Sequence, residues 1–330
     1  MSRTYNSLID LVGNTPLVEL KGFEKNNSLK ANIYGKLEYF NPTGSVKDRI
    51  AARMILDAEN EGLIHPGDTI IDNTSGNTGI SLAALGVPRG YKVVIAIEAG
   101  VSPERHQIMR AYGAELHELV DIPGLAEAAS APDATFQSLL APMAKYASEN
   151  GYYYINQCDN ASNIKAHYEG TAPEIYEALD GKVDIFITMS GTGGTLHGVG
   201  RYLKEKNPDV QIILAQPDAA SLPAPGKTEP QIDGIMMVSG VPEGLAPIFY
   251  KKYGFNFDEV ITVTGAQAYE VGREVAKSDG VFIGESSAAA LTVAKIVASR
   301  PENSGKNIVV MMADGGAKYL SSGMFKQVQE

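Results

Sequence analysis

Short apolar runs alternate with amphipathic stretches along most of this chain. The runs have the length and β-branched composition of strands, whereas the stretches between them repeat apolar residues with the spacing of a helix. The predicted strands cover residues 31–39, 68–74, 92–97, 152–157, 184–190, 210–216, 259–264 and 307–313. The clearest predicted helices cover residues 46–62, 103–115 and 266–280.

The predicted strands are apolar almost throughout and do not alternate with polar residues. Strands covered on both faces have this composition, and strands that alternate with helices form parallel sheets. The pattern therefore predicts an α/β fold with helices on both faces of its sheets. One segment, residues 220–245, is rich in turn formers and lacks clear periodicity. Long irregular segments of this kind are often functional in compact α/β proteins.

Charge and cysteine content narrow the classes of function. The 330 residues include 28 lysines and arginines against 39 acids, which gives a formal net charge of −11. Such a chain is a poor general binder of nucleic acid or of anionic membranes, so neither is expected as a partner. The single cysteine, Cys158, excludes an intrachain disulfide and fits a reducing compartment. The N-terminal stretch lacks the apolar core of a signal peptide, and no apolar window is long enough to span a bilayer. The sequence therefore favours a cytoplasmic protein.

Four turns rich in glycine or hydroxyl residues stand at the starts of predicted helices. They read NPTGSVKDRIAARM from Asn41, NTSGNTGISLAA from Asn73, MSGTGGTLHGVGRYL from Met189 and FIGESSAAALTVAKIVAS from Phe282. The first places Lys47 where a helix begins, although the helix dipole disfavours a cation there. In the fourth, one of the paired serines Ser286 and Ser287 is expected to cap the helix, and the other is free to face a ligand.

The second and third turns resemble anion sites. A strand, a small polar loop and a helix direct free backbone N–H groups and the helix dipole to one point. Glycines in residues 191–195 let the backbone approach a phosphate. This turn has neither the Gly-Lys-Ser/Thr of a P-loop nor the glycine spacing of a dinucleotide site, so it predicts a phosphate without naming the ligand. The side-chain donors in the second turn are Thr74, Ser75, Asn77 and Thr78.

Lys47 is the leading candidate for a reactive group. The five histidines have no metal-site spacing, so no metal is expected, and no GxSxG elbow is present. A lysine amine forms Schiff bases with carbonyl compounds, and the helix start would help to keep it neutral. A phosphorylated aldehyde, pyridoxal 5'-phosphate, is the most economical ligand for such a lysine and a phosphate site.

The motifs GNTPLVEL, NPTGSVKDR, TSGNTG, GTGGT and KYLSSGMF, in this order, resemble the cysteine synthase family. The resemblance runs from about residue 8 to about residue 326 and is nearest to the B-type cysteine synthases. It implies the fold type II (tryptophan synthase β-like) pyridoxal-phosphate architecture, with two three-layer αβα domains and mostly parallel sheets. Residues 1–46 plus 151–330 would form the large cofactor-binding domain, and residues 47–150 a small mobile substrate domain. A homodimer is also implied.

The resemblance assigns roles to individual residues. Lys47 would form the Schiff base with the cofactor and move the α-proton, and Asn77 would bond the ring hydroxyl. Ser286 matches the serine that faces the pyridine nitrogen, since Gly315 stands where many members carry that serine. The phosphate would be held by Gly191, Thr192, Gly193, Gly194 and Thr195. The substrate would be held by Thr74, Ser75, Gly76, Thr78, Gln157 and Gly234.

The activity implied is β-replacement on a β-substituted L-alanine through an α-aminoacrylate. In the family's commonest form, O-acetylserine and sulfide give cysteine and acetate. Asp233 leaves an alternative open, because a carboxylate near the intermediate could be a general base or only a turn residue. As a base it would favour release of sulfide from cysteine, with addition of water to give serine or of a second thiol to give lanthionine. The 231–248 loop has no arginine, which disfavours O-phosphoserine.

Two further alternatives remain. One is a catalytically silent, protein-binding relative, against which the intact Lys47 argues. The other is a serine or threonine dehydratase of the same fold. Those enzymes carry S-F-K-x-R-G-A at the lysine, whereas this chain reads SVKDRIA.

Overall fold

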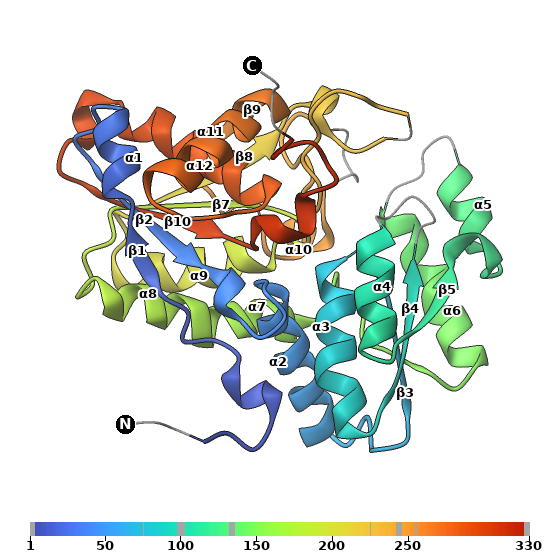
Figure 1. Cartoon of the computed structure of the whole chain (residues 1–330). Helices are drawn as coiled ribbons and strands as arrows, with labels where there is room; N and C mark the ends of the chain where they lie inside the picture. Colours follow the sequence, from blue (N-terminus) through green and yellow to red (C-terminus); the bar gives the residue numbers. More distant parts are fainter. Residues whose placement is uncertain are drawn as a thin grey trace.

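A computed structural model of the chain describes residues 4–74, 76–97, 103–131, 136–224, 226–241, 246–254 and 256–326 (Figure 1). The strands are β1 (Leu17–Glu19), β2 (Asn32–Leu37), β3 (Thr69–Asn73), β4 (Lys92–Ile97), β5 (Glu115–Glu118), β6 (Tyr153–Tyr154), β7 (Ile185–Met189), β8 (Gln211–Pro217), β9 (Glu259–Val263) and β10 (Asn307–Met312). The α-helices are α1 (Lys21–Asn26), α2 (Lys47–Asn60), α3 (Asn77–Gly86), α4 (Pro103–Ala111), α5 (Leu125–Ser130), α6 (Leu140–Glu149), α7 (Ala161–Ala166), α8 (Ala172–Ala178), α9 (Gly194–Lys206), α10 (Ile248–Tyr253), α11 (Gly265–Ser278) and α12 (Glu285–Ala298). A π-helical turn, His167–Thr171, joins α7 to α8.

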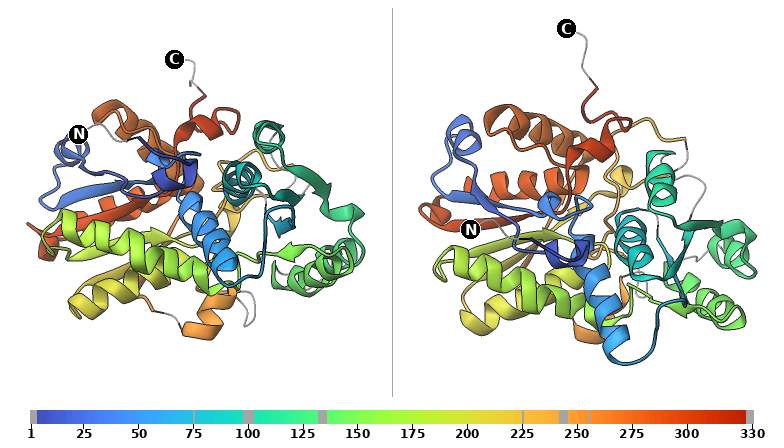
Figure 2. Two further views of the ribbon diagram at one scale, coloured as in Figure 1. Left: turned by 90° about the horizontal axis from the view of Figure 1, so that it is seen from below. Right: turned by 60° about the horizontal axis from the view of Figure 1, so that its bottom comes forward.

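The larger sheet has six strands in the order β1-β2-β10-β7-β8-β9. All neighbouring pairs are parallel except β1 with β2. Helices α1, α11 and α12 lie on one face of this sheet and α8 and α9 on the other, as the views in Figures 1 and 2 agree. The chain segments before α2 and after β6 thus build one three-layer unit.

The smaller sheet has four parallel strands in the order β5-β4-β3-β6. Alternate residues of its central strands enter two different cores, because successive side chains of a strand point to opposite faces. Ile70 and Ile95 pack in the cluster that contains α2 and α3, whereas Ile71 and Val94 pack in the cluster of α5 and α6. Strand β6 lies past residue 150, so the pairing of this sheet extends beyond the boundary expected for the small domain.

The predicted α/β fold with mostly parallel sheets is confirmed, and each of the eight predicted strands overlaps an observed one. The predicted run 152–157 is strand only at Tyr153–Tyr154. Two edge strands, β1 and β5, were not predicted. Their sequences, LVE and ELHE, are short and partly polar, so they leave no apolar run to recognise.

Three strands of the two sheets end close to one another and position the site. The carboxyl ends of parallel strands are the usual place for ligands in α/β folds. β3 ends at Asn73, β7 at Met189 and β10 at Met312, and the residues that follow each strand line one cavity. Within the described ranges, no helix has the length and apolar character that crossing a membrane requires.

Candidate active site

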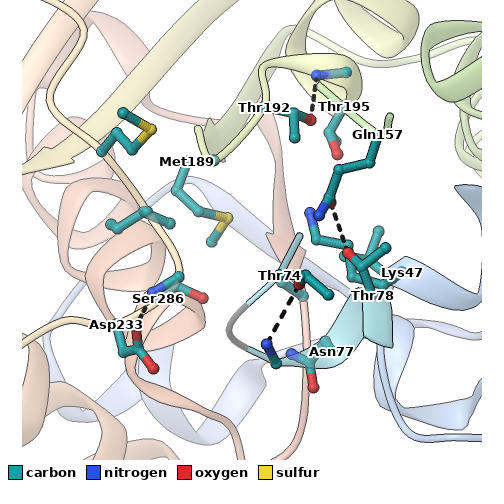
Figure 3. A pocket seen from close by; sticks show the side chains of 18 of the residues that line it. Lys47, Thr74, Asn77, Thr78, Gln157, Met189, Thr192, Thr195, Asp233 and Ser286 are labelled. Carbon is teal, nitrogen blue, oxygen red and sulfur yellow. Dashed lines mark hydrogen bonds between the residues drawn. The ribbon is translucent and has the colours of Figure 1, made fainter. Parts of the chain in front are cut away.

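One cavity of about 280 Å³ collects nearly all of the site residues predicted from the sequence. Figure 3 shows Lys47, Asn77 and Thr78 on one wall, with Ser286 and Asp233 on the other. The predicted residues that line the cavity are Lys47, Thr74, Gly76, Asn77, Thr78, Gln157, Gly191, Thr192, Gly193, Gly194, Thr195, Asp233, Gly234 and Ser286. Ser75 lies outside the described residues. Residues from both sheets therefore meet in a single pocket.

Lys47 is the first residue of α2 and lies on the wall of this pocket. The loop before it is tied to the end of β10, because the backbone N–H of Val46 donates to the carbonyl of Ala313 at 2.7 Å. Burial lowers the pKa of the Lys47 ammonium, and the nearby Cys158 and Asp314 oppose this shift. The helix start predicted a neutral lysine, and burial is the largest cause that favours one. An uncharged amine can act as a nucleophile or a base.

A buried cluster of charges holds α2 in place behind Lys47. Arg49 Nε donates to Glu38 Oε2 at 2.6 Å, and Arg49 Nη1 donates to Glu174 Oε1 at 2.7 Å. Lys36 Nζ donates to the other oxygen of Glu174 at 2.6 Å. Burial opposes ionisation of Glu174, but Arg49 and Lys36 prevail and lower the pKa of its carboxyl to about 2. Two cations and two anions thus connect β2, α2 and α8.

The glycines of residues 191–195, a segment that we call the cup, leave room only for backbone. A Cβ on Gly191 would lie 3.0 Å from the carbonyl oxygen of Gly234, and one on Gly193 would lie 2.9 Å from the ring of Tyr250. A Cβ on Gly194 would collide with Asn163 Oδ1. The N–H groups in the first turn of α9, which starts at Gly194, have no partner within the helix. This glycine cradle at a helix N-terminus fits the phosphate of pyridoxal phosphate.

Side chains behind the cup orient its hydroxyl groups. Asn163 Nδ2 donates to Thr192 Oγ1 at 3.0 Å, so the Thr192 proton is available to a ligand. His167 Nε2 lies 3.2 Å from Thr195 Oγ1, and burial lowers the pKa of this histidine. His197 Nδ1 lies 2.8 Å from the carbonyl oxygen of Gly193. Nothing in the sequence around His167 indicates this contact with the cup.

The turn after β3 offers a second set of donors. Helix α3 begins at Asn77, and its first-turn N–H groups lack intrahelical partners. Thr78 Oγ1 donates to Gln157 Oε1 at 2.7 Å, which joins this turn to the segment after β6. Thr74, Gly76 and Asn77 line the pocket beside it. These groups suit a carboxylate.

The two serines that open α12 differ in their surroundings. Ser286 lines the pocket, where a ring nitrogen could be met. Ser287 is fully buried, and its hydroxyl lies 3.4 Å from the backbone nitrogen of Asp314. Gly315 offers no side chain to the pocket. Of the two serines, the geometry thus favours Ser286 as the ligand-facing one.

Asp233 is part of an ion pair that crosses the pocket. Its Oδ2 accepts from Nη1 of Arg105, a residue of α4 that the sequence analysis did not single out. Its Oδ1 accepts from the backbone N–H of Gly234 at 2.7 Å. The side chain of Asp233 is 31% exposed and that of Arg105 only 10%. Both oxygens of the carboxylate are therefore engaged in this conformation.

Comparisons with known proteins identify the family of this chain. The profile of the family described as "Pyridoxal-phosphate dependent enzyme" matches residues 8–314. A cysteine synthase of Staphylococcus aureus (strain N315) is 37% identical over 97% of both chains. The crystal structure of a cysteine synthase from Entamoeba histolytica is 38% identical, covers 100% of this chain and 93% of its own, and has a TM-score of 0.82.

A hydrogen sulfide-producing enzyme from Fusobacterium nucleatum is also similar. It is 37% identical, covers 96% of this chain and 100% of its own, and has a TM-score of 0.77. Within the described residues, no group of three or more histidine, cysteine or acidic side chains could hold a metal ion. The match over residues 8–314, together with a cavity that joins a buried lysine to a glycine cradle, shows that this chain belongs to the pyridoxal-phosphate dependent enzymes.

Proposed function

We propose that this chain makes L-cysteine and acetate from O-acetylserine and sulfide. The C–O bond at the β-carbon breaks, a C–S bond forms there, and acetate leaves with the electron pair of the broken bond. Similarity to the cysteine synthases from Staphylococcus aureus and Entamoeba histolytica supports this assignment. The observation that carries it is the convergence of Lys47, the cup and the carboxylate-binding turn on one cavity.

In this proposal each group of residues has a separate task. Pyridoxal phosphate, when bound, withdraws electrons from the substrate, so that the α-hydrogen becomes acidic and a β-substituent can leave. The cup holds the phosphate, while Asn77 and Ser286 contact the ring. Lys47 takes the proton from the α-carbon and returns it after sulfide has added. The α-carboxylate is held by Thr74, Ser75, Gly76, Thr78 and Gln157, with Gly234 beside the substrate side chain.

We further propose that residues 47–150 move as a small domain against the rest of the chain. Closure would exclude water while the reactive intermediate exists. The ion pair of Arg105 with Asp233 joins the two parts and supports this proposal. The resemblance to cysteine synthases supports a homodimer in the cytoplasm. Light scattering of the purified protein would test the dimer.

A second candidate function is release of sulfide from cysteine, with water or a second thiol as the incoming nucleophile. The observation that favours it is the carboxylate of Asp233, which lines the substrate pocket, and the Fusobacterium nucleatum relative is named for sulfide production. The contacts of Asp233 with Arg105 and Gly234 weigh against its acting as a base. To do so, it would have to leave Arg105.

Steady-state kinetics separate the two candidates. The purified holoenzyme is given O-acetylserine plus sulfide, and in parallel cysteine alone, and kcat/KM is compared. A larger kcat/KM for the first reaction supports the proposed function, whereas faster release of sulfide from cysteine overturns it. In the second case, Asp233→Asn should abolish serine formation if Asp233 is the base. A protein that binds the cofactor but turns over neither substrate would be a silent relative.

A further inference from the structure

The side chain of Asn77 is held from two sides by charged residues of the other half of the molecule. Lys318 Nζ donates to Asn77 Oδ1 at 2.8 Å. Asn77 Nδ2 donates to Asp314 Oδ2 at 2.7 Å. Asn77 begins α3, beside the smaller sheet, whereas Asp314 and Lys318 follow β10 of the larger sheet. The two contacts span 241 and 237 positions of sequence.

The chemistry of these partners leaves the amide only one orientation. A lysine Nζ that contacts an amide oxygen must donate, and a carboxylate can only accept. A flipped amide would place NH₂ against the lysine and C=O against the carboxylate, so both contacts would be lost. Asp314 is itself fixed, because the hydroxyl of Tyr319 donates to its Oδ2 at 2.6 Å and its side chain is 1% exposed.

The orientation determines what Asn77 can offer to the pocket. One of its two amide hydrogens is taken by Asp314, and no second acceptor for Nδ2 lies among the residues that the structure describes. Oδ1 already accepts from Lys318, so the hydrogen-bonding group of Asn77 that has no partner among the described residues is the second N–H of Nδ2. This N–H suits an oxygen that accepts a hydrogen bond.

We propose that Lys318 and Asp314 are positioning residues that lock Asn77 as a donor toward the ring oxygen of the cofactor. An N–H donor stabilises an anionic oxygen, so this fixed orientation of Asn77 favours the form of the cofactor whose ring oxygen is deprotonated. Lys318 lies in a buried site, which lowers the pKa of its ammonium, while Asp314 and Asp48 oppose that shift. The proposal rests on the cofactor site described above but requires no turnover.

The test compares absorbance spectra and cofactor affinities of variants. Bound pyridoxal phosphate absorbs visible light when its ring oxygen is deprotonated, and near-ultraviolet light when that oxygen is protonated. Lys318→Met should lower the share of the visible band and raise the cofactor Kd about fivefold, the loss of one hydrogen bond. Lys318→Arg should restore both. Asp314→Asn should lower the visible share with Lys318 intact, because an amide partner accepts either orientation of Asn77.

A matched control comes from Lys306, whose Nζ donates to Asn303 Oδ1 at 2.9 Å. Neither residue lines the pocket, so Lys306→Met removes a similar bond without touching the site. An unchanged spectrum in Lys318→Met, or an equal change in Lys306→Met, would overturn the proposal. If Lys318→Met does not fold, Asp314→Asn decides alone, and a wild-type spectrum in that variant overturns the proposal. A low turnover with these spectral shifts intact would instead count against the proposed reaction.

Discussion

The two ends of the pocket are held together in different ways. At the cup, the supporting side chains Asn163, His167 and His197 all follow β6 and belong to the same half of the molecule as the cup. At the opposite end, contacts cross from one half to the other. Arg105 pairs there with Asp233, and Gln137 Nε2 donates to the carbonyl of Ala246.

This difference bears on two separate properties of the site, its affinity for the cofactor and its choice of substrate. The cup is complete whatever the small sheet does, so its affinity for a phosphate should not depend on closure. The contacts of Arg105 with Asp233 and of Gln137 with Ala246, which we call the crossing end, would form only when the halves meet in the proposed closure. We infer that the cup anchors the cofactor permanently, whereas the crossing end governs entry and selection of substrates.

The largest effect is expected where the two ends meet, at Lys47. Lys47→Ala removes the proposed base, which should lower kcat by about 10³-fold or more. Steady-state formation of cysteine measures this. The cofactor should still enter the cup, since its phosphate contacts are intact. Lys204→Ala, a change in a lysine that pairs with Asp258 at the surface, should be nearly silent. Equal activity of Lys47→Ala and wild type would refute the role of Lys47.

A second prediction tests whether the charge cluster around Glu174 stabilises α2, through the pH dependence of the free energy of unfolding. The pKa of Glu174 is about 2 in the folded protein, below its ordinary value of 4.5. Its contribution is thus fully present above pH 4.5 and is lost as the pH falls toward 2. Glu174→Gln should cost about 3 kcal/mol at pH 7, and its stability should fall less steeply in acid.

Urea unfolding at several pH values between 2 and 7 measures this contribution. Glu177→Gln is the matched control, since Glu177 is exposed on the same helix. If both variants lose stability in acid as wild type does, the charge cluster does not hold α2.

A third prediction tests whether the cup is as tightly packed as its glycines indicate. In Gly194→Ala the new methyl group would collide with Asn163 Oδ1, and overpacking of this kind costs about 1–3 kcal/mol. The cofactor Kd should rise about tenfold or more, as titration of the apo-protein would show. Gly200→Ala lies on the same helix, where the nearest atom to a Cβ is 3.5 Å away, and should bind as wild type. Equal affinities of the two variants would mean that the cup is not tightly built.

The smallest effect is expected at the crossing end. Arg105→Met and Asp233→Asn should each raise the KM for the amino acid a few-fold while leaving the cofactor Kd unchanged. In a double-mutant cycle on kcat/KM the two changes should couple by about 1 kcal/mol, because each alone breaks the same contact. Additive effects, or a shift of the cofactor Kd, would remove the distinction between the two ends.

The cup and the turn after β3 could be predicted because their signals are local. In residues 189–203 and 73–84 a strand, a glycine-rich turn and a helix follow one another within a few residues. The strong burial of β7 and β10 likewise leaves a continuous apolar run that is easy to recognise.

Arg105 and Lys318 could not be predicted as site residues. Arg105 lies 128 positions from Asp233, and Lys318 lies 241 positions from Asn77, so only the folded chain brings them together. Each also belongs to a stretch in which a charged residue is unremarkable. For Asp233, the sequence left a general base or a turn residue open, and the ion pair that engages it depends on the docking of α4.

Borohydride reduction of the holoenzyme, followed by peptide mass mapping, tests most directly whether Lys47 is the reacting amine. Reduction fixes the cofactor to the amine with which it has condensed. Two lysines compete for this role, Lys47 on the pocket wall and Lys318 beside Asn77. The pyridoxyl group should be found on Lys47 alone. Its presence on Lys318, or its absence from Lys47, would contradict the account.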